Sequence, residues 1–62
     1  MREPIAPRQL DILALARKSR RILVDGLAEH FDVTPQTIRK DLNDLCDRGF
    51  LQRVHGGAVL SS

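Results

Sequence analysis

The chain has 62 residues, 42% of them hydrophobic, and its ten Lys or Arg against eight Asp or Glu leave a net charge of +2. This length fits one small domain of marginal stability and leaves no room for an enzyme cleft with its own walls. The apolar share is too high for a disordered chain, and with two Phe and no Trp or Tyr the core must be aliphatic. The mildly basic balance favours an anionic partner.

No targeting or membrane segment is visible. The single cysteine, Cys46, excludes an internal disulfide and fits a reducing compartment. No apolar run follows the charge at Arg2, so no signal peptide is predicted, and no apolar stretch approaches the roughly 18 residues of a membrane span. We therefore expect a soluble cytoplasmic protein.

A first helix is expected after a short leader. Residues 1–6 are interpreted as a flexible leader, since Pro7 suits the first turn of a helix, where its missing N–H costs nothing. Apolar residues at helical spacing, Leu10 and Leu13 among them, then predict a helix over about 8–17.

Four basic residues stand at the end of this helix and just beyond it: Arg17, Lys18, Arg20 and Arg21. Such a cluster is a solvated face or a nucleic-acid contact, and the sequence leaves open whether it touches DNA.

A β-branched run over 21–24 predicts a short strand that needs a later pairing partner. Alternation would bury Ile22 and Val24 and leave Leu23 outward, either as ordinary surface or as a contact with a region outside this sequence. A second helix is predicted from residue 24 or 25 to Phe31.

A tight turn and a third helix come next. Asp32 tolerates the left-handed conformation that ends a helix. Thr34 is a good N-cap and Pro35 a good first helical residue, so a third helix is predicted over about 35–48. Gly49 would then stop this helix as a left-handed cap.

Residues 50–54 read as a strand, Gly56 and Gly57 as a two-residue hairpin turn, and 58–60 as the returning strand. Together with 21–24 they predict a three-stranded sheet. The predicted fold class is α+β, mainly α. Its architecture is a winged helix-turn-helix over 7–60, with three helices and a small antiparallel sheet whose hairpin is the wing.

The third helix is predicted to have two chemically different faces. Ile38, Leu42 and Leu45 form an inward face, with Cys46 at its edge. An arc of about 100° on the opposite side gathers basic and amide side chains. These are Gln36, Arg39, Lys40 and Asn43.

This outward arc suits direct readout of double-stranded DNA, because Arg and Lys can donate to guanine and Gln and Asn can bond adenine in the major groove. Thr34 and Thr37, beside free N–H groups at the helix start, can hold a phosphate. Asp41 and Asp44 lie on a third flank, and only Asp47 intrudes on the arc near the helix end.

The hairpin offers a second contact. A thin tip containing His55 and Gly56, with Arg53 close by, can approach phosphates or enter a minor groove. The plainer interpretation is that the two glycines only satisfy a tight turn.

Two other classes of function were weighed. A winged-helix module for protein contact or RNA binding would need an exposed apolar patch or aromatics on the hairpin, whereas Phe31 and Phe50 occupy core-like positions. An enzyme is disfavoured, because Cys46, His30 and His55 lack zinc-site spacing and no catalytic constellation is present. We expect no cofactor, no metal and no catalytic residue.

Two blocks of this sequence resemble the N-terminal signature of DeoR-family transcriptional regulators. They are the run TPQTIRKDLNDL from Thr34 to Leu45, followed by Gly49, and the run RVHGGA over 53–58. The resemblance spans about residues 8–60. Within the family, the run PQTIR with the later DLN is similar to the glycerol-3-phosphate repressor branch.

The resemblance implies the head of a bacterial repressor of sugar or sugar-phosphate metabolism, with the third helix in the major groove and the hairpin on the backbone or minor groove. Residues 61–62 would begin a linker to a sensor domain, absent here, that binds a phosphorylated sugar or glycerol-3-phosphate and multimerises. The full-length protein would be a homo-oligomer and the isolated head a monomer.

The family's DNA-contacting pattern falls on five positions of this chain: Thr34, Gln36, Thr37, Arg39 and Lys40. Three departures stand out. Gly26 replaces a charged helix former, Asp32 a frequent glycine, and Lys40 a frequent Arg, which weakens bidentate readout there.

Overall fold

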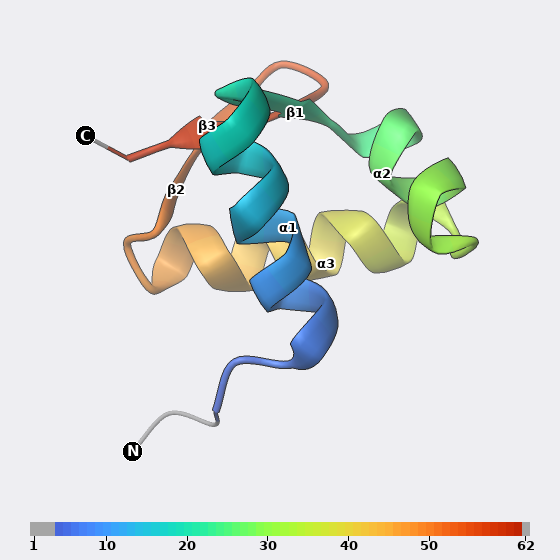
Figure 1. The fold of residues 1–62 in the computed structure, drawn as a ribbon, viewed down its shortest axis with the longest axis horizontal. Helices are drawn as coiled ribbons and strands as arrows, with labels where there is room; N and C mark the ends of the chain where they lie inside the picture. Colours follow the sequence, from blue (N-terminus) through green and yellow to red (C-terminus); the bar gives the residue numbers. More distant parts are fainter. Residues whose placement is uncertain (1–3, 62) are drawn as a thin grey trace.

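The computed structural model describes residues 4–61, so residues 1–3 of the predicted leader and residue 62 of the predicted linker lie outside the described part. The elements in chain order are α1 (Pro7–Ser19), β1 (Arg21–Leu23), α2 (Val24–Phe31), α3 (Pro35–Asp47), β2 (Leu51–Val54) and β3 (Gly57–Leu60). Three helices surround a small antiparallel sheet, and α1 crosses in front of α3 (Figure 1). This arrangement confirms the predicted fold class and the winged helix-turn-helix.

Helix α1 is longer than its sequence pattern predicts. It begins at Pro7 and runs to Ser19, two residues past the expected end. It stops at Arg20, which adopts a positive φ of 68° that a continuing helix cannot accommodate. At its start, the side chain of Gln9 accepts a hydrogen bond from the Ala6 N–H at 3.0 Å. That bond satisfies one backbone donor that the helix leaves without a partner.

The turn between α2 and α3 is held by hydrogen bonds of its own backbone. Asp32 has φ 56° and ψ 48°, the left-handed conformation expected of it. Its N–H donates to the Glu29 carbonyl at 3.2 Å, and the Val33 N–H donates to the Ala28 carbonyl at 3.0 Å. These are the two bonds of a Schellman motif, so α2 ends with its last carbonyls satisfied.

Helix α3 ends in the same way at a glycine. Gly49 has φ 86°, and its N–H donates to the Cys46 carbonyl at 3.0 Å. The Phe50 N–H reaches back to the Leu45 carbonyl, also at 3.0 Å. Phe50 therefore belongs to the helix cap, and β2 begins at Leu51, one residue later than predicted.

The three strands form one sheet in the order β1-β3-β2, with both pairings antiparallel. Val54 pairs with Gly57, so the hairpin turn consists of His55 and Gly56. The prediction of a turn at Gly56 and Gly57 was therefore wrong by one residue. Gly56 takes the positive φ of 77° in the turn, while Gly57 opens β3.

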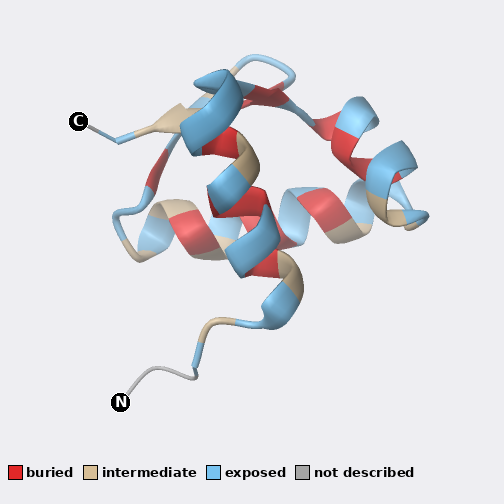
Figure 2. Cartoon of the chain, in the orientation of Figure 1, coloured by how far each residue is buried: buried red, intermediate tan, exposed pale blue. Residues whose placement is uncertain are grey.

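The core lies between α1, α3 and the inner face of the sheet (Figure 2). Its fully enclosed large side chains are Ile12, Ile38, Leu42 and Leu45. Ile22 and Val24 are buried and Leu23 is 51% exposed, as alternation along the first strand predicts.

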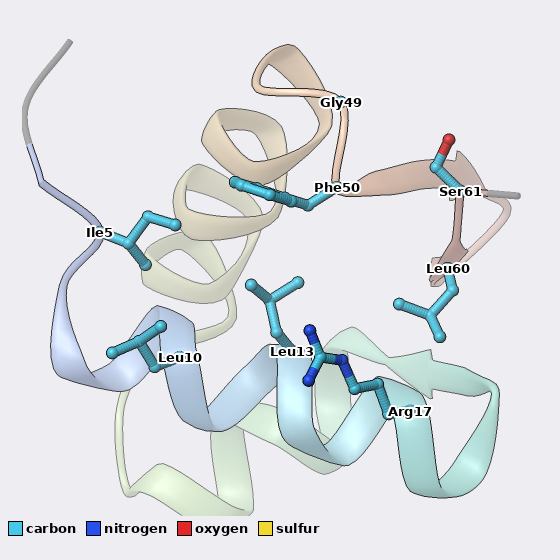
Figure 3. A pocket seen from close by; sticks show the side chains of 8 residues that line it. All are labelled: Ile5, Leu10, Leu13, Arg17, Gly49, Phe50, Leu60 and Ser61. Carbon is cyan, nitrogen blue, oxygen red and sulfur yellow. The ribbon is translucent and has the colours of Figure 1, made fainter.

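Two apolar residues predicted to face the core do not. Leu10 is 54% exposed and Phe50 is 43% exposed. Both line a hollow between α1 and the α3–β2 junction, where Ile5 and Leu13 also contribute apolar surface (Figure 3). For Phe50 the cause is the helix cap, whose backbone turns the residue out of the strand.

Candidate nucleic-acid interface

The exposed face of α3 gathers the polar residues that the sequence assigned to it. Exposed side chains on this helix include Gln36, Arg39, Lys40 and Asn43. By contrast, Ile38, Leu42 and Leu45 have no exposed surface at all. The amphipathic division of α3 is therefore clear for its aliphatic residues, although the charged residue Asp41 is also buried. Its basic and amide groups face outward together because the opposite face is fixed in the core.

The start of α3 is capped by its own side chains. Thr34 is the N-cap, and its Oγ1 accepts a hydrogen bond from the Thr37 N–H at 3.2 Å. The two hydroxyl oxygens lie 2.9 Å apart, and Thr37 is half-buried. Since Pro35 has no N–H and the Thr37 amide is capped, the Gln36 amide is a first-turn donor that can reach a phosphate. The start of α3 thus offers fewer N–H donors than its first turn alone suggests.

The hairpin tip is anchored to the start of α2. The Val24 N–H donates to the Gly56 carbonyl at 2.9 Å, and the Arg21 guanidinium donates to the His55 carbonyl at 3.4 Å. His55, Gly56 and the nearby Arg53 are all exposed. The turn thus lies at the end of the sheet that meets α2 (Figure 1), where two carbonyls already have partners.

Arg53 is the charged residue of the wing that acts on α3. It pairs with Ala58 in the sheet, and its charge acts on Cys46 of α3. Burial raises the pKa of the Cys46 thiol above its ordinary value, and the Arg53 charge offsets part of that rise. The guanidinium therefore adds positive charge beside the C-terminal half of α3.

The flank of α3 that faces α1 holds two carboxylates that bond residues of α1, and of these Asp41 is buried while Asp44 stays partly exposed. The Arg8 guanidinium pairs with the Asp41 carboxylate, which is 9% exposed as a residue. The Gln9 amide donates to Asp44 Oδ2 at 2.9 Å, and Arg48 donates to the same oxygen at 3.0 Å. The sequence predicts that Asp41 and Asp44 lie outside the outward arc, and the structure places both on the flank toward α1.

The covering residues on α1 were not predicted. Arg8 and Gln9 stand 33 and 35 residues from their partners, and no helical or strand spacing connects them. The signal available in the sequence is a glutamine near the aliphatic residues of the first helix. In the structure Gln9 is 6% exposed, and a buried amide needs a polar partner.

The second basic cluster, Arg17, Lys18, Arg20 and Arg21, lies where α1 meets β1, and all four residues are exposed. The three arginines of this cluster line one hollow together with Val59, Leu60 and Ser61. Within this cluster, as far as the described residues show, Arg21 is the one whose side chain donates a hydrogen bond to the wing, at the His55 carbonyl.

Neither a metal site nor a membrane span is found in the described part of the chain. No three ligand-type side chains among residues 4–61 come close enough to hold a metal ion. None of the described helices has the length and apolar character needed to cross a bilayer. His30 rests its ring edge-on against Phe31, with centroids 4.8 Å apart.

The DeoR-like helix-turn-helix domain matches residues 8–62. The glycerol-3-phosphate regulon repressor of Escherichia coli is 45% identical over 51 residues, covering 82% of this chain and 20% of that protein. The transcriptional repressor AccR of Agrobacterium fabrum is 42% identical over 52 residues, covering 84% of this chain and 20% of the relative.

The L-fucose operon activator of Haemophilus influenzae is 46% identical over 48 residues, or 77% of this chain and 19% of the activator. The chain thus spans about a fifth of the length of these relatives. All three are transcriptional regulators by name, and none is an enzyme. No solved structure gives a significant match.

Proposed function

Because the chain belongs to the DeoR-like helix-turn-helix family, whose domain is the DNA-binding part of transcriptional regulators, we propose that it reads a double-stranded DNA operator with α3 in the major groove. The observation that supports this most is the division of α3 into an exposed arc of basic and amide side chains and an enclosed face that carries its aliphatic residues. A helix divided in this way can enter a groove without disturbing the core.

Base readout is assigned to three side chains of the arc. Arg39 can donate both N–H groups of its fork to a guanine edge, and Gln36 and Asn43 can bond adenine. Lys40, on the margin of the arc toward α1, is assigned to a phosphate. Thr34 and Thr37 position the helix start against the backbone, with the Gln36 amide as donor.

The wing is assigned to the backbone or the minor groove. Arg53, His55 and Gly56 are exposed, and the turn is rigidly attached to β1 and α2. A rigid attachment favours positioning, because the turn reaches DNA at a fixed distance from α3 instead of folding around it.

The remainder of the regulator is proposed from its relatives. We propose that residues 7–60 form a head domain, followed by a linker and an effector-binding domain, because the match covers only about a fifth of each relative. The effector would be glycerol-3-phosphate or another phosphorylated sugar, and the full-length protein a homo-oligomer acting in the bacterial cytoplasm.

The test begins by selecting bound duplexes from a random pool, then comparing the selected sequence with a mixed-sequence duplex. Arg39→Ala should weaken the selected duplex by about 1–3 kcal/mol and narrow the gap to mixed sequence, as for a base contact. Lys40→Ala should weaken both duplexes about equally.

Arg17→Ala is the matched control, since it removes the same charge from α1, outside α3. If Arg17→Ala narrowed the gap between the selected and the mixed-sequence duplex as much as Arg39→Ala does, base readout could not be assigned to α3. The slope of log K against log salt should be roughly −4 to −5 if about four to six phosphates are engaged. A flat salt response would instead support the protein-contact function.

A further inference from the structure

The helix assigned to the groove has more negative than positive charge. Within α3 the basic residues are Arg39 and Lys40. The acidic residues are Asp41, Asp44 and Asp47. A helix of this composition would by itself be repelled by the phosphates on both sides of a major groove.

The first turn of α1 offsets part of this negative charge, on the flank of α3 that faces α1. The Arg8 guanidinium bonds the Asp41 carboxylate, whose side chain is only 12% exposed. Arg48 and Gln9 share the neighbouring carboxylate of Asp44. The compensating cation is a guanidinium, which stays charged throughout the pH range in which proteins work.

We propose that Arg8 is a positioning residue for DNA binding. It holds the Asp41 carboxylate against α1 and cancels its charge, so that the outward arc of α3 presents a net positive field to the phosphates. This inference rests on the proposed function, in which α3 enters the major groove. It assigns Arg8 an effect through Asp41 and not through a contact of its own with DNA.

The arrangement has a definite electrostatic consequence. Asp41 is the residue directly after Lys40, and its flank adjoins the margin of the arc where Lys40 stands. An uncompensated carboxylate there would repel nearby phosphates, and salt would weaken this repulsion, since the Debye length is about 10 Å at 0.1 M salt. Losing Arg8 should therefore weaken binding, and losing the Asp41 charge should strengthen it.

The experiment measures binding of the whole chain to a labelled mixed-sequence duplex by fluorescence anisotropy at low and at moderate salt. Arg8→Met and Asp41→Asn each break the same ion pair but change the local charge in opposite directions. We expect Arg8→Met to bind about threefold to fivefold more weakly and Asp41→Asn about threefold to fivefold more tightly. The double variant should bind within about twofold of the parent, and all differences should shrink as salt rises.

Opposite signs separate charge compensation from simple support of the fold. If the ion pair were only structural, both single variants would lower the melting temperature and change affinity in the same direction or not at all. Such a result would overturn the proposal. So would a double variant that stays as weak as Arg8→Met, since Arg8 would then be touching DNA itself.

Two further variants keep the test decisive. Asp11→Asn is the matched control for net charge, because Asp11 is an exposed carboxylate on α1. A gain as large as that of Asp41→Asn would show that position does not matter and would overturn the proposal. If Asp41→Asn melts below the assay temperature, Asp44→Asn should bind more tightly for the same reason. Parent protein that binds no duplex would refute the proposed function instead.

Discussion

The molecule contains two tight turns that hold its functional parts, and they are stabilised in different ways. The turn between α2 and α3 is made by its own residues. Asp32 is in the left-handed region, two backbone bonds close a Schellman motif, and Thr34 caps the next helix. The turn between β2 and β3 depends on distant residues. Its carbonyls accept from Arg21 and Val24, and Gly57 lies against β1.

The difference shows where each turn can fail. Local bonds within a few residues tolerate the loss of one member, because the others still define the turn. Where two backbones lie in close contact, an added atom cannot be accommodated by moving a side chain, so the whole contact is strained. We therefore expect the wing to be more sensitive to substitution than the helix-turn-helix, although the wing appears from its sequence to be a simple glycine turn.

The largest effect should come from Gly57→Ala. A Cβ at this position would lie 1.9 Å from the Ile22 carbonyl oxygen, a backbone atom, so β1 and β3 must separate. We expect a loss in the free energy of unfolding on the order of 3 kcal/mol, at the upper end of overpacking effects. Urea denaturation followed by circular dichroism measures it. A loss below about 1 kcal/mol would mean that the strands are not pressed together as described.

A moderate effect is expected for Thr34→Ala. This change removes the oxygen that accepts the Thr37 N–H at 3.2 Å, while the backbone bonds of the turn remain. The free energy of unfolding should fall by about 1 kcal/mol, the usual value of an N-cap. Thr34→Ser, which keeps the oxygen, is the control and should be close to the parent. Equal losses in both variants would assign the effect to the methyl group.

A stabilising change of similar size is expected for Gly26→Ala. Gly26 lies inside α2, and a Cβ there would meet nothing within 4 Å. Alanine should raise the free energy of unfolding by about 0.5–1 kcal/mol, because glycine loses more conformational freedom in a helix. The midpoint of thermal unfolding should rise accordingly. The contrast with Gly57→Ala isolates the close approach, since both variants add one methyl group to a glycine.

The smallest effect should be that of Arg21→Met. The Arg21 bond to the His55 carbonyl is long at 3.4 Å and exposed, while the Val24 bond to the neighbouring Gly56 carbonyl remains. The change in the free energy of unfolding should stay within about 0.5 kcal/mol, as for most surface positions. A larger loss in the same urea titration would show that Arg21, and not the backbone contact, holds the wing.

The α2–α3 turn was predictable because its chemistry is local. Asp32, Thr34 and Pro35 each have a conformational preference that acts within two or three residues. The inward and outward faces of α3 followed from helical period alone, and burial confirms them at Ile38 and Leu42. The roles of the outward side chains on DNA remain predictions.

The hairpin turn and Phe50 were misassigned because one depends on a distant partner and the other on a cap that overrides the strand pattern. The hairpin turn moved by one residue because pairing with β1 places Gly57, and not Gly56, against the Ile22 carbonyl. Phe50 left the core because its N–H completes the cap of α3. The conformational preferences of single residues predict neither the pairing with β1 nor the cap of α3.

The sequence by itself determined the helices, the turn between α2 and α3, the amphipathic division of α3 and the family, since all of these depend on residue types at short spacing. Only the tertiary structure decided that Arg8 and Gln9 bond the Asp41 and Asp44 carboxylates of α3, and that the wing is hydrogen-bonded to the start of α2. The physical reason is that hydrogen bonds and close backbone contacts between residues more than 30 positions apart leave no periodic trace along the chain.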